Sequence, residues 1–306
     1  MLRMRGIFLK CVGIIGLIGP TLAADSPTID KYYQAQTIIT GVLEPERMRG
    51  FREGLEEILI KVTNAPELAD DGRLKPLMEH AADLIADYSL EDRNKHLKIN
   101  DEQGTRDRPH YLRMKADRAK VDDAIARLGL KPWFDRPIFE VLLVVHDPRG
   151  AFLVGDELPR DQASREAAKI RLGGEDLNLV SKTWDGFEQR EALKSIGKRR
   201  GYDVAFPNRP DAKPDGSVVN PVFPPSEAGR AIARWRGDLF PDASGFWRLE
   251  SRAWKVSGAG EVDDDPACYG SSRGGVTFDI SIRDSLDAFA RLFKDGMTQK
   301  CLTGPA

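Results

Sequence analysis

Cysteine and histidine are scarce in this sequence, which holds three cysteines and four histidines among 306 residues. The histidines show no metal-ligand spacing, and the H-E-x-x-H pattern of zinc proteases does not occur. Neither "GGED" nor "SSRGG" has the Gly-Lys-Ser/Thr ending of a phosphate-binding loop. No segment after the N-terminus approaches 18 uninterrupted apolar residues. The sequence therefore predicts no metal, no cofactor and no stable membrane span in the mature chain.

The first 23 residues have the order of a secretory signal peptide. Arg3, Arg5 and Lys10 form a basic region, a short apolar run follows at 11–18, and small residues at 21–23 suit cleavage. We predict that the protein is exported through this signal peptide to the periplasm. A retained N-terminal anchor is the alternative.

The charge of the mature chain is mildly acidic. Removal of residues 1–23 leaves 43 Lys and Arg against 48 Asp and Glu, a formal net charge of −5. A nucleic-acid-binding protein normally presents a basic face, so this balance argues against nucleic acid as a partner. The composition is globular, with 41% apolar and 31% charged residues. The remaining length suits one large or two ordinary domains.

Two cysteines remain after signal cleavage removes Cys11. In an oxidising compartment, Cys268 and Cys301 are predicted to form one disulfide. Such a bridge would close a loop of about 34 residues and typically contributes about 2–4 kcal/mol. Two unpaired thiols are the alternative.

Residues 27–148 are predicted to form an N-terminal α/β unit with the order strand–helix–helix–strand–helix–strand. Phe51, Leu55, Ile58, Leu59 and Val62 recur at helical spacing after Pro45. The last strand, 138–145, is apolar enough to be covered on both faces. The expected strands lie at 32–41, 109–117 and 138–145, the helices at 45–63, within 74–88 and at 118–130, and a loop at 91–109.

Residues 149–306 are predicted to form a C-terminal α+β unit with a helical insertion and a Pro-rich loop at about 208–226. The overall fold class is α+β (mixed α/β), with two small sheet-plus-helix units. The expected elements are helices over 159–201, strands at 202–207, 245–258 and 274–285, a helix end with a strand at 230–239, and a closing helix at 285–296.

The stretch "ACYGSSRGGVTFDI" contains the G-x-S-x-G pattern of a serine-hydrolase nucleophile elbow. That motif needs a strand before it, a helix after it and a downstream histidine. Here an acidic segment with Pro266 precedes, a strand is predicted to follow, and His146, the last histidine, lies upstream of Ser272. We therefore interpret the stretch as a hairpin turn and predict no catalytic residue. The run Asp263-Asp264-Asp265 lacks the ligand spacing of a Ca²⁺ loop.

Tryptophan and arginine alternate in the C-terminal unit. Aromatic residues on a strand usually belong to the core, whereas Trp and Arg together are favoured at binding interfaces. Both interpretations stay open for this segment. The candidate interaction surface consists of Trp235, Arg236, Arg248 and Arg252.

Several blocks in their chain order resemble an exported Gram-negative family known as domain of unknown function 2066 (DUF2066). They are "YYQAQTIITG…FREGLEEILIKVTN", "YLRMKAD…WFDRPIFEVLLVVHD", "ALKSIGKRRGYDVAFP", "ARWRGDL…GFWRLESRAWKV" and "SLDAFARLF". The resemblance implies small envelope domains similar to the N-terminal domain of TolB. It implies no catalytic residues, and the stretches 150–190 and 208–226 depart from the pattern.

The leading functional hypothesis is a non-enzymatic periplasmic binding or scaffold protein of the cell envelope, with an unidentified protein partner. One alternative is a hydrolase or other enzyme with an unrecognised site, for which His146 and Asp147 at a strand end are candidates. The other is a small-ligand carrier with its pocket between the two units.

Overall fold

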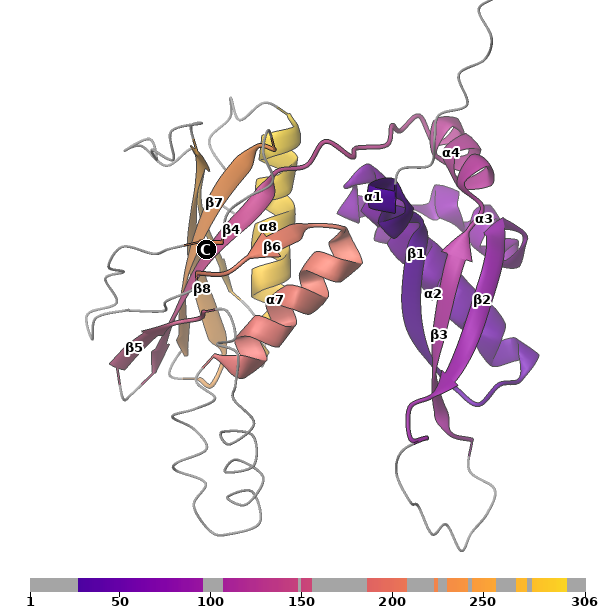
Figure 1. The fold of residues 1–306 in the computed structure, drawn as a ribbon, viewed down its shortest axis with the longest axis horizontal. Helices are drawn as coiled ribbons and strands as arrows, with labels where there is room; N and C mark the ends of the chain where they lie inside the picture. The colour runs from indigo at the N-terminus through magenta and orange to yellow at the C-terminus, as the bar shows by residue number, and fades with distance from the viewer. Residues whose placement is uncertain are drawn as a thin grey trace, which may run out of the picture.

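The computed structural model describes residues 27–95, 107–147, 150–155, 186–207, 223–224, 230–241, 244–256, 268–273 and 277–295. They form two units, each with a sheet and its own apolar core (Figure 1). The α+β fold class is confirmed. The predicted signal peptide, Cys301, the Asp263–Asp265 run and most of the predicted helical insertion and Pro-rich loop lie outside the described residues.

The first unit contains an antiparallel sheet of order β1-β3-β2, with one face covered by helix α2. Its elements are α1 Pro27–Asp30, η1 Lys31–Tyr33, β1 Gln34–Thr40, α2 Glu44–Thr63, η2 Pro66–Asp70, η3 Gly72–Leu74, α3 Lys75–Glu79, η4 Ala81–Leu84, β2 Ile85–Asp92, β3 Pro109–Ala116 and α4 Arg118–Arg127.

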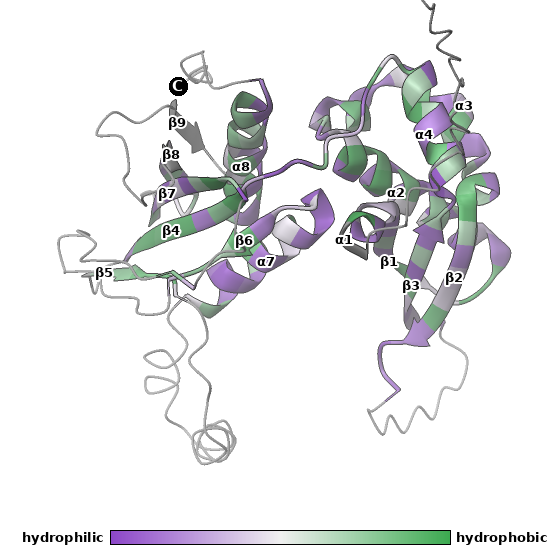
Figure 2. Ribbon diagram, turned by 45° about the horizontal axis from the view of Figure 1, so that its top comes forward, coloured by the Kyte–Doolittle hydropathy of each residue, from purple (hydrophilic) through white to green (hydrophobic). Residues whose placement is uncertain are grey.

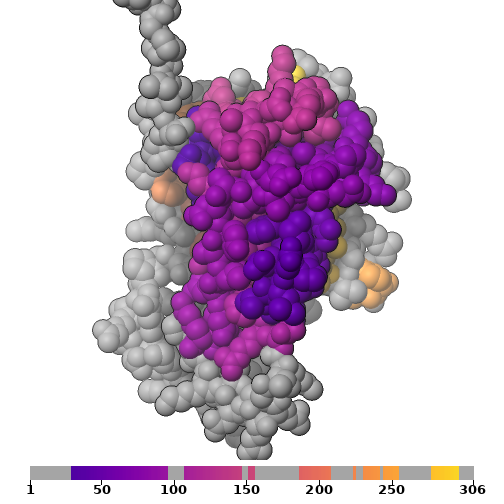
Figure 3. Space-filling view, turned by 90° about the vertical axis from the view of Figure 1, so that its right-hand side faces the viewer, coloured from indigo at the N-terminus to yellow at the C-terminus, as the bar shows by residue number. Residues whose placement is uncertain are grey.

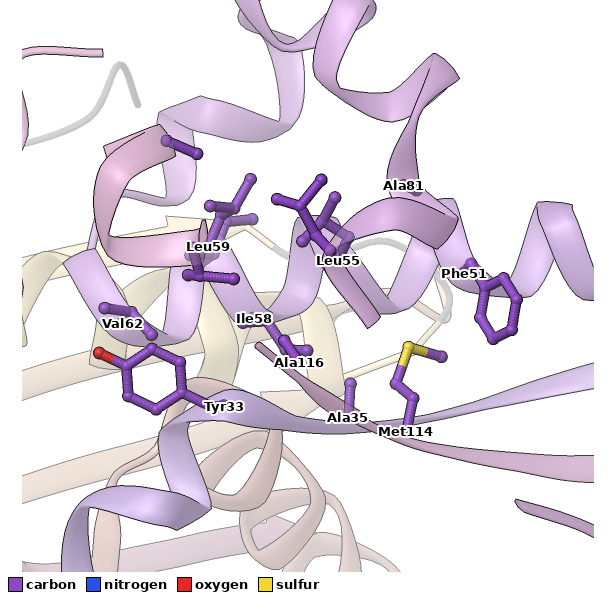
Figure 4. Close-up of a cluster of buried hydrophobic side chains, with 14 of the residues drawn as sticks. Tyr33, Ala35, Phe51, Leu55, Ile58, Leu59, Val62, Ala81, Met114 and Ala116 are labelled. Atoms are coloured by element: carbon purple, nitrogen blue, oxygen red, sulfur yellow. The ribbon is translucent and has the colours of Figure 1, made fainter. Parts of the chain in front are cut away.

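Helix α2 forms because its apolar residues recur at helical spacing and give it one buried stripe. Leu55, Ile58, Leu59 and Val62 have no exposed surface and belong to the apolar core of the first unit (Figure 4). The helix lies close to the strands at Gly54, where an added Cβ would stand 2.3 Å from the sulfur of Met114. Helix α2 thus packs directly on the sheet, in which β1 is an edge strand.

The second unit contains a larger mixed sheet of order β5-β4-β7-β8-β9, with β6 also paired to β4. Strand β4 runs parallel to β6 and β7, and the other pairs are antiparallel. The elements are β4 Ile138–Asp147, β5 Gly150–Leu153, α7 Phe187–Arg200, β6 Asp203–Ala205, β7 Ile232–Pro241, β8 Trp247–Val256, β9 Cys268–Arg273 and α8 Asp279–Lys294.

Helices α7 and α8 cover the sheet face that is turned towards the first unit (Figure 1). Phe139, Trp235, Leu249 and Phe289 are buried between sheet and helices. Hydropathy colouring shows β4 as largely apolar and α7 as largely polar (Figure 2). From the side of the first unit, the described residues of the second unit are visible only at its margins (Figure 3).

Strand β4 is covered on both faces, as its apolar run predicts. Val141 and Leu143 pack in the main core, whereas Leu142 and Val144 pack against Leu153 on the other face. However, β4 pairs with β7 and thus belongs to the second sheet. Sheet membership changes between Phe134 and Ile138, earlier than the expected boundary at 148.

Three other sequence predictions are wrong. The helix expected within 74–88 is a chain of short helical turns that leads into β2, a strand the sequence did not suggest. No helix end precedes β7, since Arg230 and Ala231 are not helical. The strand expected at 274–285 is the start of helix α8, and the strand instead comprises Cys268–Arg273.

Candidate binding cleft between the two units

The last turn of α2 receives hydrogen bonds from several separate parts of the chain. A helix leaves its final four carbonyl groups without partners inside the helix. Here the N–H of Asn64 donates to Ile60 O at 2.8 Å, and that of Trp133 donates to Val62 O at 2.9 Å. The ammonium group of Lys294 donates to Thr63 O at 3.0 Å, and Arg136 donates to Lys61 O. Each of the four carbonyls therefore has a partner.

Arg136 lies where the C-termini of two helices meet. Its guanidinium donates to Lys61 O in α2, to Arg200 O at the end of α7 and to Trp133 O. The side chain is buried, and a cation there interacts favourably with the negative ends of both helix dipoles. The ring centroids of Tyr32 and Trp133 lie 4.8 and 4.9 Å from the guanidinium carbon, which adds cation–π attraction. Arg136 thus holds the two units together.

Adjacent aromatic residues fix the connecting segment to both cores. Phe134 packs on the first core, with its ring centroid 5.2 Å from that of Tyr32. Trp133 packs on the second core. The W-x-x-R-P segment is therefore anchored on both sides, and this explains why it carries Trp, Phe and Arg within four positions.

A second buried group joins the C-terminal ends of α2 and α7 to the middle of α8. The hydroxyl of Tyr202 lies 2.6 Å from Asn64 Oδ1 and 2.9 Å from Asp287 Oδ1. Arg200 Nε donates to both carboxylate oxygens of Asp287, at 3.1 and 3.0 Å. Burial raises the pKa of the Tyr202 phenol well above its usual value, and the neighbouring Asp287 raises it further. The phenol therefore stays protonated and links the units as a neutral group.

Ion pairs continue the junction towards solvent. Lys31 of the first unit lies 2.7 Å from Asp203 of the second, and Arg230 lies 2.8 Å from the same carboxylate. Burial acts to raise the pKa of Asp203, but hydrogen bonds from Lys31 and Arg230 outweigh it and leave the pKa below its usual value. Arg199 of α7 donates to Glu57 of α2 at 2.9 Å. These pairs close one end of the space between the units.

A cleft of about 780 Å³ lies beside this junction, and we call it the interunit cleft. The first unit contributes five consecutive residues of β1, the acidic residues of α2 and parts of β3, and the second contributes α7 and the turn after it. Its lining residues are Lys31, Gln34–Ile38, Glu53, Glu56, Glu57, Lys61, Arg113, Met114, Ser195, Gly197–Arg199 and Gly201–Asp203. This volume is within the range of ordinary ligand sites.

The candidate interaction surface predicted from the sequence is divided between the two faces of the second sheet. Trp235 is 1% exposed on the helix-covered face, where its indole N–H donates to Ser285 at 3.1 Å. Placing it on a surface was therefore wrong. Strand alternation puts Arg236, Arg248 and Arg252 on the opposite face. The core interpretation of this tryptophan is the correct one.

His146 also lies on the helix-free face. Its Nε2 is 3.2 Å from Asp238 Oδ1, and its ring stacks on Phe240 with centroids 4.2 Å apart. Arg236 donates to the same carboxylate at 2.9 Å. Burial acts to raise the pKa of Asp238, but the hydrogen bonds from Arg236 and His146 outweigh it and leave the pKa lowered. The partner of His146 is thus Asp238 on the neighbouring strand.

Sheet register separates Ser272 from His146. Ser272 pairs with Leu249, which is buried on the helix-covered face, whereas His146 stacks on Phe240 on the other face. The prediction of a strand after the G-x-S-x-G stretch is wrong, and the interpretation of Ser272 as non-catalytic stays a prediction. The predicted disulfide stays a prediction, because Cys301 lies outside the described residues.

Two further sequence expectations concern membrane spans and metal sites. In the described part of the chain, no helix combines the length and apolar character that a membrane span needs. There is also no grouping of three or more His, Cys, Asp or Glu side chains suited to a metal ion within the same residues.

Sequence analysis did not identify the residues of the junction, although it quoted the segment that contains Arg136. Arg136 lies in the W-x-x-R-P block on which the family resemblance partly rests, and an arginine before proline among aromatic residues is the only signal that could have indicated it. Tyr202, Asn64 and Asp287 come from three distant segments and share no pattern in the sequence.

Part of the chain matches the model of a known protein family. Residues 27–134 match the model of a family described as a domain of unknown function (DUF8605), which covers about a third of the chain. The matched segment coincides with the first unit and ends two residues before Arg136. No curated protein and no solved structure matches the chain. The resemblance to DUF2066 concerns a different family and stays a prediction, as does the likeness to TolB.

Proposed function

We propose that this protein is an exported, non-enzymatic binding or scaffold protein of the cell envelope, and that a partner protein binds in the interunit cleft. Export is supported by the basic region, apolar run and small residues of positions 1–23. The resemblance to the exported DUF2066 family supports the same compartment.

The observation that carries the proposal is the construction of the cleft. Its walls come from two separately cored units, and a buried junction of Arg136, Tyr202 and Asp287 fixes their relative position. A surface held in this way is preorganised, which reduces the entropy that binding would otherwise lose. Ile38, a large apolar residue that lines the cleft, is 46% exposed. It offers a partner one apolar contact within a lining that is largely charged and polar.

Site-specific photo-crosslinking in the cell envelope tests the proposal. A benzoylphenylalanine at position 38 should form a discrete adduct with one envelope protein. The matched control is position 280, because Ile280 is 41% exposed and does not line the cleft. Adduct formation at 38 and not at 280 is the expected result. No adduct at 38, or the same adducts at both positions, would contradict the proposal.

The compartment is tested separately. N-terminal sequencing of protein recovered from the periplasmic fraction should begin close to residue 24. An intact Met1 would show that the signal peptide is not cleaved. Titration of free thiols in the same material should find none if Cys268 and Cys301 are bridged, and two if they are not.

A further inference from the structure

Strand β1 presents a free edge to the interunit cleft. Its only neighbour in the described sheet is β3, and Gln34–Ile38 all line the cleft. The N–H of Gly41 donates to Arg108 O at 2.8 Å, in continuation of the β1–β3 ladder. In an antiparallel pair, alternate residues direct both backbone groups to the same side. Odd-numbered residues of β1 therefore bond to β3. Gln34, Gln36, Ile38 and Thr40 direct their backbone groups away from β3, and the first three of these residues line the cleft.

Side chains of α2 satisfy both ends of this edge and leave its centre open. Lys61 donates to Gln34 O at 2.5 Å, and Arg49 donates to Ile38 O at 3.3 Å. Glu46 accepts from the N–H of Thr40 at 3.4 Å. The N–H and C=O of Gln36 lie between these caps, and no hydrogen-bond partner for them is found within the described part of the chain. An exposed strand edge of this kind is a template for a further strand.

The cleft lining carries both acidic and basic side chains, and one of the acidic ones has no ion pair among the described residues. Glu53 pairs with Arg49 at 2.5 Å, and Glu57 pairs with Lys61 at 3.3 Å and Arg199 at 2.9 Å. Glu56, the third acidic residue of α2 in the lining, has no ion pair among the residues described. Burial raises the pKa of Glu56 and Asp70 raises it further, whereas Arg200 and Arg199 lower it without cancelling the rise. A cation of the ligand paired directly with Glu56 would stabilise its charged form.

We propose that the interunit cleft binds an extended segment of a partner protein by strand addition to β1, with a lysine or arginine of that segment paired to Glu56. The backbone of Gln36 exchanges hydrogen bonds with the segment, which is the β-augmentation mode of peptide recognition. Side chains on one face of the added strand point towards α2, and those on the other face lie beside Gln36 and Arg113. This inference rests on the proposed function and specifies the chemistry of its partner.

Selection from a random peptide library tests the proposal. The probe is a library of nine-residue peptides with blocked ends, presented to the mature full-length protein. We expect enrichment of β-branched residues in alternation, with Lys or Arg at a fixed position. Enrichment of acidic peptides, or no enrichment at all, would overturn the proposal.

Two variants at one position separate backbone pairing from side-chain contacts. Gln36→Pro removes the edge N–H, whereas Gln36→Ala keeps it, and both lose the side-chain contact with Arg113. Because the N–H faces the cleft, proline at this edge costs no hydrogen bond to β3. The Pro variant should bind the selected peptide about tenfold more weakly than the Ala variant. Equal binding by the two variants, with matching thermal midpoints, would refute strand addition.

The ion pair is tested with Glu56→Gln and with a peptide in which norleucine replaces the selected lysine. For the native pair, affinity should rise as pH increases through the titration of Glu56, because a bound cation lowers the pKa of that carboxyl. Either replacement should remove this dependence. If it persists in both, Glu56 is not the partner.

The outcomes distinguish this proposal from the broader one. If photo-crosslinking at position 38 captures a partner equally well in the Gln36→Pro protein, the binding function stands and strand addition is wrong. If crosslinking fails in the wild-type chain, the proposed function itself is wrong.

Discussion

Within each unit, apolar side chains of the helices pack on apolar side chains of a sheet. Between the units, by contrast, charged and phenolic side chains form hydrogen bonds with backbone carbonyls and carboxylates. In the first core, Leu55, Ile58 and Leu59 have no exposed surface. At the junction, the buried groups are Arg136, Tyr202 and Asp287. Apolar contacts depend mainly on buried area, but hydrogen bonds require a fixed direction. The cores therefore supply stability, and the junction sets the relative orientation of the units.

The largest expected effect comes from breaking one core. Phe139 is fully buried, with its ring 5.1 Å from that of Tyr202 and 5.6 Å from that of Phe289. Phe139→Ala should lower the free energy of unfolding by about 3–5 kcal/mol. Urea denaturation followed by tryptophan fluorescence measures this, because the described tryptophans lie in the second unit and in the segment leading to it. A loss of less than about 1 kcal/mol would mean that the site is not a packed core.

Breaking the junction at Arg136 should have a smaller effect, confined to the contact between the units. Arg136→Met keeps an apolar stem but removes the guanidinium, so three carbonyls, one buried and two partly buried, lose their donor at a cost of about 2–4 kcal/mol. Hydrogen exchange should quicken in the last turns of α2 and α7, while protection of β3 and β7 is kept. Arg136→Lys, which retains the charge with fewer donors, should be intermediate. Unchanged exchange at the end of α2 would contradict the assigned role.

A steric test of the junction uses two glycines with similar backbones. Gly201 has φ +73°, and an added Cβ would stand 2.7 Å from the Tyr32 ring and 3.0 Å from Lys61 Cγ. Gly129 has φ +76° and open space around it. Both alanine variants should lose about 1 kcal/mol from the left-handed conformation. Gly201→Ala should lose about 1–2 kcal/mol more through the clash with the first unit. Equal shifts of the thermal midpoint in the two variants would show that the junction moves to accommodate the added methyl group.

The smallest expected effect is a pH dependence from Asp203. Its pKa is lowered in the folded protein, so its contribution is fully present above the unfolded value of about 3.9 and is lost as pH falls below it. Because Asp203 is 36% exposed, the contribution should be below about 1 kcal/mol. Thermal midpoints of wild type and Asp203→Asn should converge between pH 5 and pH 3. Parallel curves would indicate that this carboxylate contributes nothing.

Sequence patterns predicted the cores well because buried residues recur with the period of the helix or strand that carries them. The stripe in α2 and the two-faced run of β4 are examples. Strand β2 was missed because half of its side chains are exposed and none is buried, and β9 because Gly and Ser have little strand preference. The start of α8 was mistaken for a strand, since Val276, Phe278 and Ile280 alternate although Ile282, Leu286 and Phe289 follow helical spacing.

Much less of the candidate site could be predicted from the sequence. The segment "WFDRP" lies within one of the blocks that carry the family resemblance, but the partners of Arg136 are backbone carbonyls, which any residue supplies. The open centre of β1 depends on which strand edge lacks a neighbour, and this is decided by pairing between distant segments. No local sequence pattern indicates the carbonyl partners of Arg136 or the free edge of β1.

The final cap of α2 has a consequence for the order in which the protein matures. Thr63 O receives its hydrogen bond from Lys294, 231 residues later in the chain. During synthesis from the N-terminus, α2 and its sheet emerge long before that lysine exists. The last carbonyl of α2 therefore has no donor until almost the whole polypeptide has been made. A chain truncated before α8 would lack this cap, together with the Asp287 carboxylate that binds Tyr202.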